Sequence, residues 1–149
     1  MSVVAQIIDT TISKLQTHSA SPDVYEGLNF KTQSKPVTAI VYLYKEINGR
    51  RSASNILNTI YEVRIKWRIV KTDKVQRGTL HRTLMEHLRE VRRIFHYLNA
   101  GDISSSIPGF FMCTTEYGET FDEEIHPEYE MINEAIGEVK VLWEFFEAI

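Results

Sequence analysis

The clearest pattern in the sequence is a strict alternation of apolar and charged residues between Ile60 and Lys71. The charged positions of this stretch are Glu62, Arg64, Lys66 and Arg68. A period of two residues is typical of a β-strand, which directs successive side chains to opposite faces of a sheet. We therefore predict a strand with one face in the core and one charged face turned to water, a partner or countercharges.

Two stretches have apolar residues three to four positions apart, the spacing of an amphipathic helix. The first covers residues 2–18, and Ser2 is its expected N-cap. The second covers Thr79–Asn99, with Thr79 or Asp73 as the expected N-cap. The residues between the alternating strand and this helix, 72–78, are predicted to form a polar link.

Three further strands are predicted. Val37–Ile47 is rich in β-branched and aromatic residues and is apolar on both faces, which is typical of a central strand. Gly109–Thr115 is predicted as a short strand and Ala135–Phe146 as the last one. The last stretch also fits helical spacing, but Gly137 and its bulky Val, Trp and Phe residues favour a strand. The sequence does not decide whether residues 24–30 form a short additional strand.

Two connections in the chain are unusually polar. Asn48-Gly49 is a turn signal, and the Arg-, Ser- and Asn-rich residues that follow predict a protruding loop over about residues 48–59. We interpret this loop as the tip of a hairpin between antiparallel strands. Loops of this length in compact domains often carry function. The second connection is an acidic stretch, about residues 116–130, which is predicted to be a loop or ragged hairpin with a turn near Tyr117.

The predicted order is helix, strand, strand, helix, strand, strand. This order indicates an α+β fold: a mainly antiparallel β-sheet with two α-helices packed on one face. With 149 residues, 43% of them hydrophobic and 25% charged, the chain has the length and composition of a single folded domain over residues 1–149.

Charge is unevenly distributed along the chain. Residues 60–100 contain ten Lys or Arg and four Asp or Glu, a net charge of +6. Residues 101–149 contain one Lys and twelve Asp or Glu, a net charge of −11. A basic middle and an acidic end can pair within one fold or between copies of it.

The sequence offers little for catalysis, metal binding or cofactor binding. The five histidines show neither an HxxxH nor an HExxH spacing, and no Walker A or GxGxxG motif is present. Cys113 lies in an apolar run, where a buried side chain is more common than a nucleophile. We expect no enzyme activity, no metal and no cofactor. No apolar stretch is long enough to span a membrane, so we expect no membrane partner.

The basic residues allow two interpretations. Arginines at positions 82, 89, 92 and 93 lie on the second predicted helix, and those at 64 and 68 lie on the alternating strand. One interpretation is contact with nucleic-acid phosphates. The other, which we favour, is cross-strand and interface pairing with the C-terminal acids, because no set of stacking aromatic residues accompanies the arginines.

The order of these elements resembles that of phage tail terminator (tail completion) proteins. The resemblance covers the N-terminal helix, the two long strands with a protruding connection, the RGTLHRTLMEHLREVRRIFHYLN helix and the closing EVKVLWEFFE strand. The IYEVRIKWRIVK strand carries it most clearly. The acidic stretch 116–130 is longer than in that family, and the family has no motif from which functional residues could be transferred.

The resemblance implies a structural virion protein of the tail or neck, assembled in the host cytoplasm. Copies of the chain would form a ring, a hexamer in this family, that caps the head-proximal end of the tail tube and joins it to the head-tail connector or head-closure protein. DNA would pass through the lumen. The expected subunit-interface or lumen residues are Glu62, Arg64, Lys66, Arg68, Arg89, Arg92, Arg93, Glu138 and Glu144. The expected tube-contacting residues are Gly49, Arg50, Arg51 and Asn55.

Two other functions remain open from the sequence. One is another phage neck or head-closure protein. The other is a small nucleic-acid-binding domain that uses the basic helix.

Overall fold

A computed structural model of the chain describes residues 2–30, 35–53, 55–103, 106–120 and 131–148. The elements are α1 (Val3–Leu15), β1 (Asp23–Glu26), β2 (Val37–Ala53), β3 (Ile56–Gln76), α2 (Arg77–Phe95), the 3-10 helix η1 (Ala100–Asp102), β4 (Phe110–Thr120) and β5 (Met131–Ala148). The five strands form one sheet in the order β1-β2-β3-β5-β4. Only β1 and β2 run parallel, so the predicted α+β fold with a mainly antiparallel sheet is confirmed.

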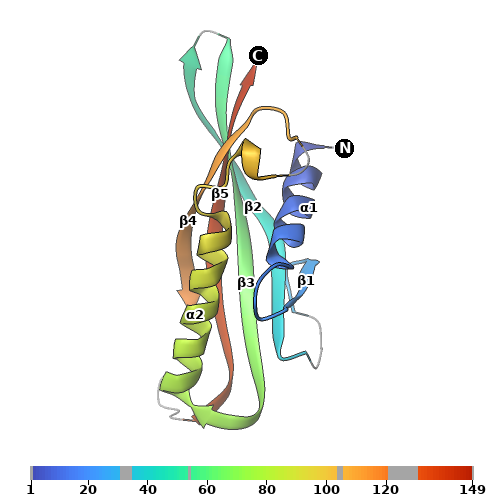
Figure 1. The fold of residues 1–149 in the computed structure, drawn as a ribbon. Coiled ribbons are helices and arrows are strands. Elements are labelled where there is room, and N and C mark those ends of the chain that lie inside the picture. Colours follow the sequence, from blue (N-terminus) through green and yellow to red (C-terminus); the bar gives the residue numbers. More distant parts are fainter. Residues whose placement is uncertain (1, 31–34, 54, 104–105, 121–130, 149) are drawn as a thin grey trace.

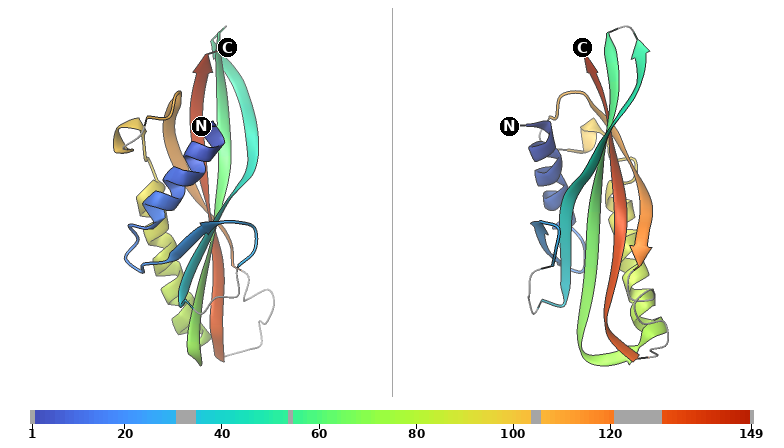
Figure 2. Two further views of the ribbon diagram at one scale, coloured as in Figure 1. Left: turned by 90° about the vertical axis from the view of Figure 1, so that its right-hand side faces the viewer. Right: turned by 180° about the vertical axis from the view of Figure 1, so that it is seen from behind.

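Both long helices lie on the same face of the sheet, as predicted (Figures 1 and 2). Ser2 caps α1 because its hydroxyl accepts a hydrogen bond from the backbone N–H of Ala5 at 3.1 Å. Within the described residues, no helix is both long and apolar enough to cross a membrane. The opposite face of the sheet carries no helix, and we call it the helix-free face.

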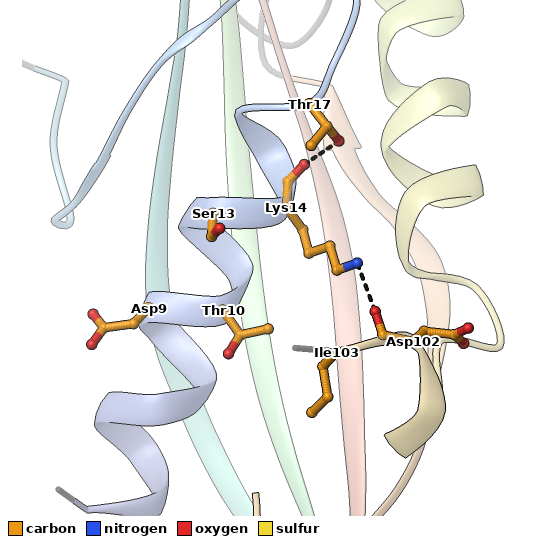
Figure 3. Close-up of a pocket in the computed structure, with 7 residues that line it drawn as sticks. All are labelled: Asp9, Thr10, Ser13, Lys14, Thr17, Asp102 and Ile103. Atoms are coloured by element: carbon orange, nitrogen blue, oxygen red, sulfur yellow. Dashed lines mark hydrogen bonds between the residues drawn. The ribbon is translucent and has the colours of Figure 1, made fainter. Parts of the chain in front are cut away.

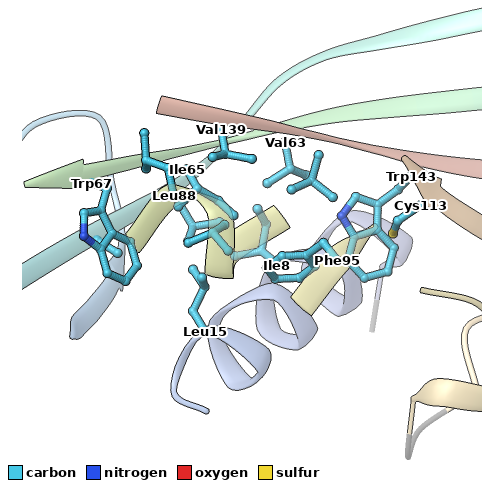
Figure 4. Close-up of a cluster of buried hydrophobic side chains, with 14 of the residues drawn as sticks. Ile8, Leu15, Val63, Ile65, Trp67, Leu88, Phe95, Cys113, Val139 and Trp143 are labelled. Carbon is cyan, nitrogen blue, oxygen red and sulfur yellow. The ribbon is translucent and has the colours of Figure 1, made fainter. Parts of the chain in front are cut away.

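β3 occupies the centre of the sheet. It pairs with β2 on one side and with β5 on the other, where the register runs from Ile56 opposite Ala148 to Gln76 opposite Met131. Its apolar face lies against both helices, and Figure 4 shows the resulting core between sheet and helices. The fully buried core side chains include Trp67 and Trp143 from the sheet and Phe95 from α2.

The predicted protrusion at about residues 48–59 is a hairpin between antiparallel strands, as expected, but most of it is strand and not loop. β2 and β3 continue through this segment as a long hairpin whose last described pairs join Asn48 to Thr59 and Ala53 to Ile56. The hairpin projects beyond both helices, and the end of β5 runs alongside it, with Ala148 opposite Ile56 (Figure 1). Polar side chains allow this extension because the strands project into solvent, where a core-facing pattern is not needed.

Two other predicted boundaries also need correction. Residues 72–76 are the last part of β3 rather than a link, and α2 begins at Arg77, so neither Thr79 nor Asp73 caps it. β4 continues to Thr120 through the predicted turn near Tyr117, so the acidic loop does not begin at residue 116. The remainder of the predicted acidic loop, residues 121–130, lies outside the described residues.

The prediction of a final strand is confirmed, and the competing C-terminal helix is excluded. β5 is longer than predicted and pairs with β3 and β4. Gly137 sits where β5 passes under α2: a Cβ at this position would lie 2.8 Å from Cδ1 of Leu88 and 3.3 Å from Cδ2 of Leu84. The glycine therefore permits close packing of the helix on the strand.

We expect Gly137→Val to lower the free energy of unfolding by about 1–3 kcal/mol, because the added side chain overpacks the contact with Leu88. Urea unfolding measures the change. Gly78→Ala is the matched control, since nothing lies within 4 Å of a Cβ there and Gly78 is in α2. The control should raise stability by about 0.5–1 kcal/mol. Equal effects of the two substitutions would contradict the packing explanation.

Candidate functional site

The helix-free face brings together six of the predicted interface residues. Over residues 60–70 of β3 and 134–146 of β5, the even-numbered residues point to this face because their odd-numbered neighbours fill the core. Lys66 lies opposite Glu138, and Arg64 lies opposite Lys140. The six predicted residues on this face are Glu62, Arg64, Lys66, Arg68, Glu138 and Glu144.

Arg64 is the centre of this surface. Its Nε donates a hydrogen bond to Oε2 of Glu62 at 2.8 Å, and its guanidinium lies 3.6 Å from Oε1 of Glu138. The guanidinium carbon is 3.3 Å from the ring centroid of Tyr44, so the charged group stacks on the aromatic face. Three neighbours from three strands therefore fix one side chain.

The two glutamates that hold Arg64 are buried, although no helix covers them. Their side chains are 8% exposed for Glu62 and 3% exposed for Glu138. Burial raises the pKa of the Glu138 carboxyl above its usual value, and the charge of Arg64 opposes this rise. The hydroxyl of Tyr42 also donates a hydrogen bond to Oε2 of Glu138, at 3.4 Å. The cluster is thus a pre-formed ionic network on an otherwise open sheet.

Other basic residues on this face also have neighbours. The Lys66 ammonium lies 5.7 Å from the ring centroid of Tyr42, and the Arg68 guanidinium lies 4.7 Å from that of Phe30. Glu116 of β4 is opposite Lys140. The sequence of β3 alone indicates a basic strand. On the folded face, acidic residues of β4 and β5 balance this positive charge.

The three predicted helix residues do not join this surface. Arg89 and Arg93 are exposed on α2, which lies on the other side of the sheet. Arg92 is turned toward β4, where its Nε donates to the hydroxyl of Thr115 at 3.1 Å and its guanidinium lies over the ring of Tyr117. The predicted set thus falls into two groups on opposite layers.

The predicted tube-contacting residues lie at the projecting hairpin. Gly49, Arg50 and Arg51 are part of β2, and their side chains lie outside the description. Asn55 is exposed at the turn that joins β2 to β3. The backbone thus places all four near the far end of the hairpin (Figure 1).

Sequence reasoning missed a histidine cluster that ties three elements together. The Trp67 indole N–H donates to Nδ1 of His87 at 3.0 Å, and Nε2 of His18 lies 3.0 Å from the carbonyl oxygen of His87. Nδ1 of His18 accepts from the backbone N–H of Ala20 at 3.0 Å, so the proton of the neutral His18 ring is on Nε2. The carboxylate of Glu90 accepts from Ser19 and lies 3.8 Å from His18. No sequence spacing links residues so far apart.

A pocket of about 370 Å³ lies between α1 and η1. Figure 3 shows Lys14 reaching across it, and its ammonium donates to the backbone oxygen of Asp102 at 2.9 Å. The other lining side chains are short and polar, apart from Ile103. Among the residues that the structure describes, no three His, Cys, Asp or Glu side chains are placed to hold a metal ion. Cys113 is buried in the core, which raises the pKa of its thiol and disfavours the reactive thiolate.

We expect Arg64→Met to lower the free energy of unfolding by about 3 kcal/mol at pH 8, because it leaves Glu62 and Glu138 buried without their cation. Methionine keeps an unbranched stem of similar length. Without Arg64 the pKa of Glu138 rises further, so the carboxyl binds its proton more readily when folded than when unfolded. The loss should therefore shrink as the pH falls from 8 to 5, which urea unfolding at each pH measures.

Lys140→Met is the matched control for this prediction. Lys140 lies opposite Arg64 on the same face but forms no ion pair in the described parts of the chain. Its replacement should change the free energy of unfolding by about 0.5 kcal/mol or less. If Lys140→Met lowers the free energy of unfolding as much as Arg64→Met does, then the loss of any positive charge on this face destabilises the protein, and the explanation by the buried glutamates is wrong.

A second prediction concerns the histidine cluster. Burial, assisted by the neighbouring His18, lowers the pKa of His87. The folded state thus binds fewer protons than the unfolded state, and stability is lost as the pH falls below about 6.5. His87→Gln removes this titration, so its unfolding free energy should depend less on pH between 7.5 and 5 than that of the wild type. Identical slopes in urea unfolding would contradict the assignment.

Comparison with known proteins assigns no family to the chain. The sequence matches no protein-family model and no curated protein. The site is therefore defined by its geometry: a rigid, charge-balanced sheet face on one side, exposed helix arginines on the other, and a hairpin that projects beyond both.

Proposed function

We propose that the protein is a structural subunit of a phage tail terminator, which forms a ring at the head-proximal end of the tail tube. In this role the chain acts through surfaces and not through catalysis. Its partners are further copies of itself, the tail tube protein and the head-tail connector or head-closure protein, and DNA passes through the ring. The protein would then reside in the tail or neck of the virion.

The observation that carries the proposal is the projecting hairpin. A ring subunit at the end of a tube must contact its neighbours in the ring and also reach along the tube axis. The body of this protein, with its two helices, suits the first task, and the β2–β3 hairpin suits the second (Figure 1). The predicted contact residues Gly49, Arg50, Arg51 and Asn55 lie on this hairpin.

The helix-free face supports the same proposal. Its network holds Arg64 in place before any partner arrives, which reduces the entropy that association would otherwise cost. The face also carries exposed aromatic side chains: Tyr44, which stacks on Arg64, is 49% exposed, and Phe111, which packs on Phe146 further along β5, is 48% exposed. Aromatic residues beside fixed charges are typical of protein–protein interfaces.

The same features also fit another neck or head-closure protein, which would likewise be a ring subunit of the virion. A nucleic-acid-binding domain is the second candidate, and the exposed arginines of α2 favour it. That function requires affinity for DNA with a steep dependence on salt. Absence of DNA binding at low salt would remove it.

We expect the purified protein at high concentration to form closed rings of six copies. Multi-angle light scattering gives the mass in solution, and negative-stain electron microscopy of the same sample shows the shape. Rings with six-fold symmetry would support a terminator or related connector. A protein that remains monomeric at every concentration, and that does not bind the ends of tail tubes, would contradict the proposal.

A further inference from the structure

The exposed side of α2 carries a stripe of arginines. Arg82, Arg89 and Arg93 are spaced seven and four residues apart, which places them on one face of the helix. All three are exposed, and two acidic residues, Glu86 and Glu90, lie between them in the sequence. The carboxylate of Glu90 is bound to Ser19, where it accepts a hydrogen bond from the backbone N–H. None of the three forms an ion pair with any described residue. We call these three residues the arginine stripe.

The opposite side of the molecule carries a complementary set of acidic residues. Glu116 lies opposite Lys140 on the helix-free face, and Glu134 shares that face with Glu138, four residues further along β5. Glu119 is close enough to Glu138 for its charge to raise the pKa of that carboxyl. Glu116, Glu119 and Glu134 are exposed and make no ion pair within the described ranges. We call them the acidic strip.

The positions of these two surfaces restrict how copies of the chain can associate. The arginine stripe is on the helix layer, and the acidic strip is on the far face of the sheet at β4 and β5 (Figure 2). A two-fold dimer through either surface would place like charges together. A head-to-tail contact pairs the arginine stripe of one copy with the acidic strip of the next, and such heterologous contacts close into rings.

We propose that the arginine stripe of α2 docks on the acidic strip of β4 and β5 in a second copy of this chain, forming the repeated contact of the ring. This inference rests on the proposed function and specifies its subunit interface. In this arrangement the β4–β5 side of the helix-free face contacts another copy of the chain, and it does not face DNA in the lumen.

Charge sets the orientation of this contact, and apolar side chains supply part of its affinity. Exposed ion pairs contribute little to stability on their own, but they select partners and speed association. Met85 is exposed on α2 between Arg82 and Arg89. Phe111 and Phe146 pack together on the β4–β5 side, 5.4 Å between ring centroids.

Two charge-reversal variants test the contact. Arg82→Glu/Arg89→Glu/Arg93→Glu makes both surfaces acidic, and Glu116→Lys/Glu119→Lys/Glu134→Lys makes both basic. Each variant alone should be monomeric in light scattering, because every head-to-tail contact then joins like charges. An equimolar mixture should recover assemblies in which the variants alternate, since each surface again meets its opposite. Circular dichroism and thermal unfolding of each variant check that the fold is intact.

Lys35→Glu/Lys71→Glu/Lys74→Glu is the matched control. It changes the net charge by the same amount as the arginine variant, at exposed lysines that lie outside both surfaces. This variant should form the same rings as the wild type. Added salt should weaken the wild-type ring, because the contact is solvent-exposed.

The outcomes separate this inference from the proposed function. If the wild type and both reversal variants form rings, the proposed function stands and the contact is wrong. If the reversal variants are folded monomers that the mixture does not rescue, the charges do not pair with each other and the contact is also wrong. If the arginine variant forms rings but loses affinity for a DNA duplex that the wild type binds, the stripe is a nucleic-acid surface. A wild type that never oligomerises and does not bind the ends of tail tubes removes both proposals.

Discussion

The structure depends on the length of β3 and on the two different faces that its alternating sequence creates. At about 3.3 Å per residue, its 21 residues span roughly 70 Å, whereas the 19 residues of α2 span roughly 28 Å at 1.5 Å per residue. Helices of this length cannot cover such a strand. The covered part forms the core, and the rest must be a two- or three-stranded arm with solvent around it.

The charged face of β3 follows from the same alternation. The residues that β2 and β5 place beside this face determine which of its charges are paired and which are buried. Arg64 is central because β5 supplies Glu138 and β2 supplies Tyr44, while Glu62 comes from β3 itself. Two carboxylates buried on an open sheet cost desolvation energy, which the guanidinium and the Tyr42 hydroxyl offset. The result is a surface whose shape is fixed in the isolated subunit, an advantage for a component that must assemble in one register.

The sequence predicts the covered part of this fold better than the projecting part. Alternation identified β3 and β5, and helical periodicity identified α1 and α2, because burial against a core imposes a pattern. The outer hairpin and residues 72–76 have no such pattern, although both pair with a neighbouring strand. The candidate site was predicted as a list of charged positions. Alternation placed six of them on one face, but it could not show that Glu62 and Glu138 are buried or that Arg92 turns toward Thr115.

The arm also has a mechanical property. In an antiparallel sheet the inter-strand hydrogen bonds lie perpendicular to the strands, so they do not carry a pull that acts on β2 and β3 in the same direction. The covalent backbones of these two strands carry such a pull from the tip of the arm into the body, and β5 supports β3 along the same segment up to Ile56. A bending force would meet less resistance, because the outer hairpin is a single layer. The hairpin is therefore stiff along its length and compliant across it, the behaviour of a tether that can adjust its angle without stretching.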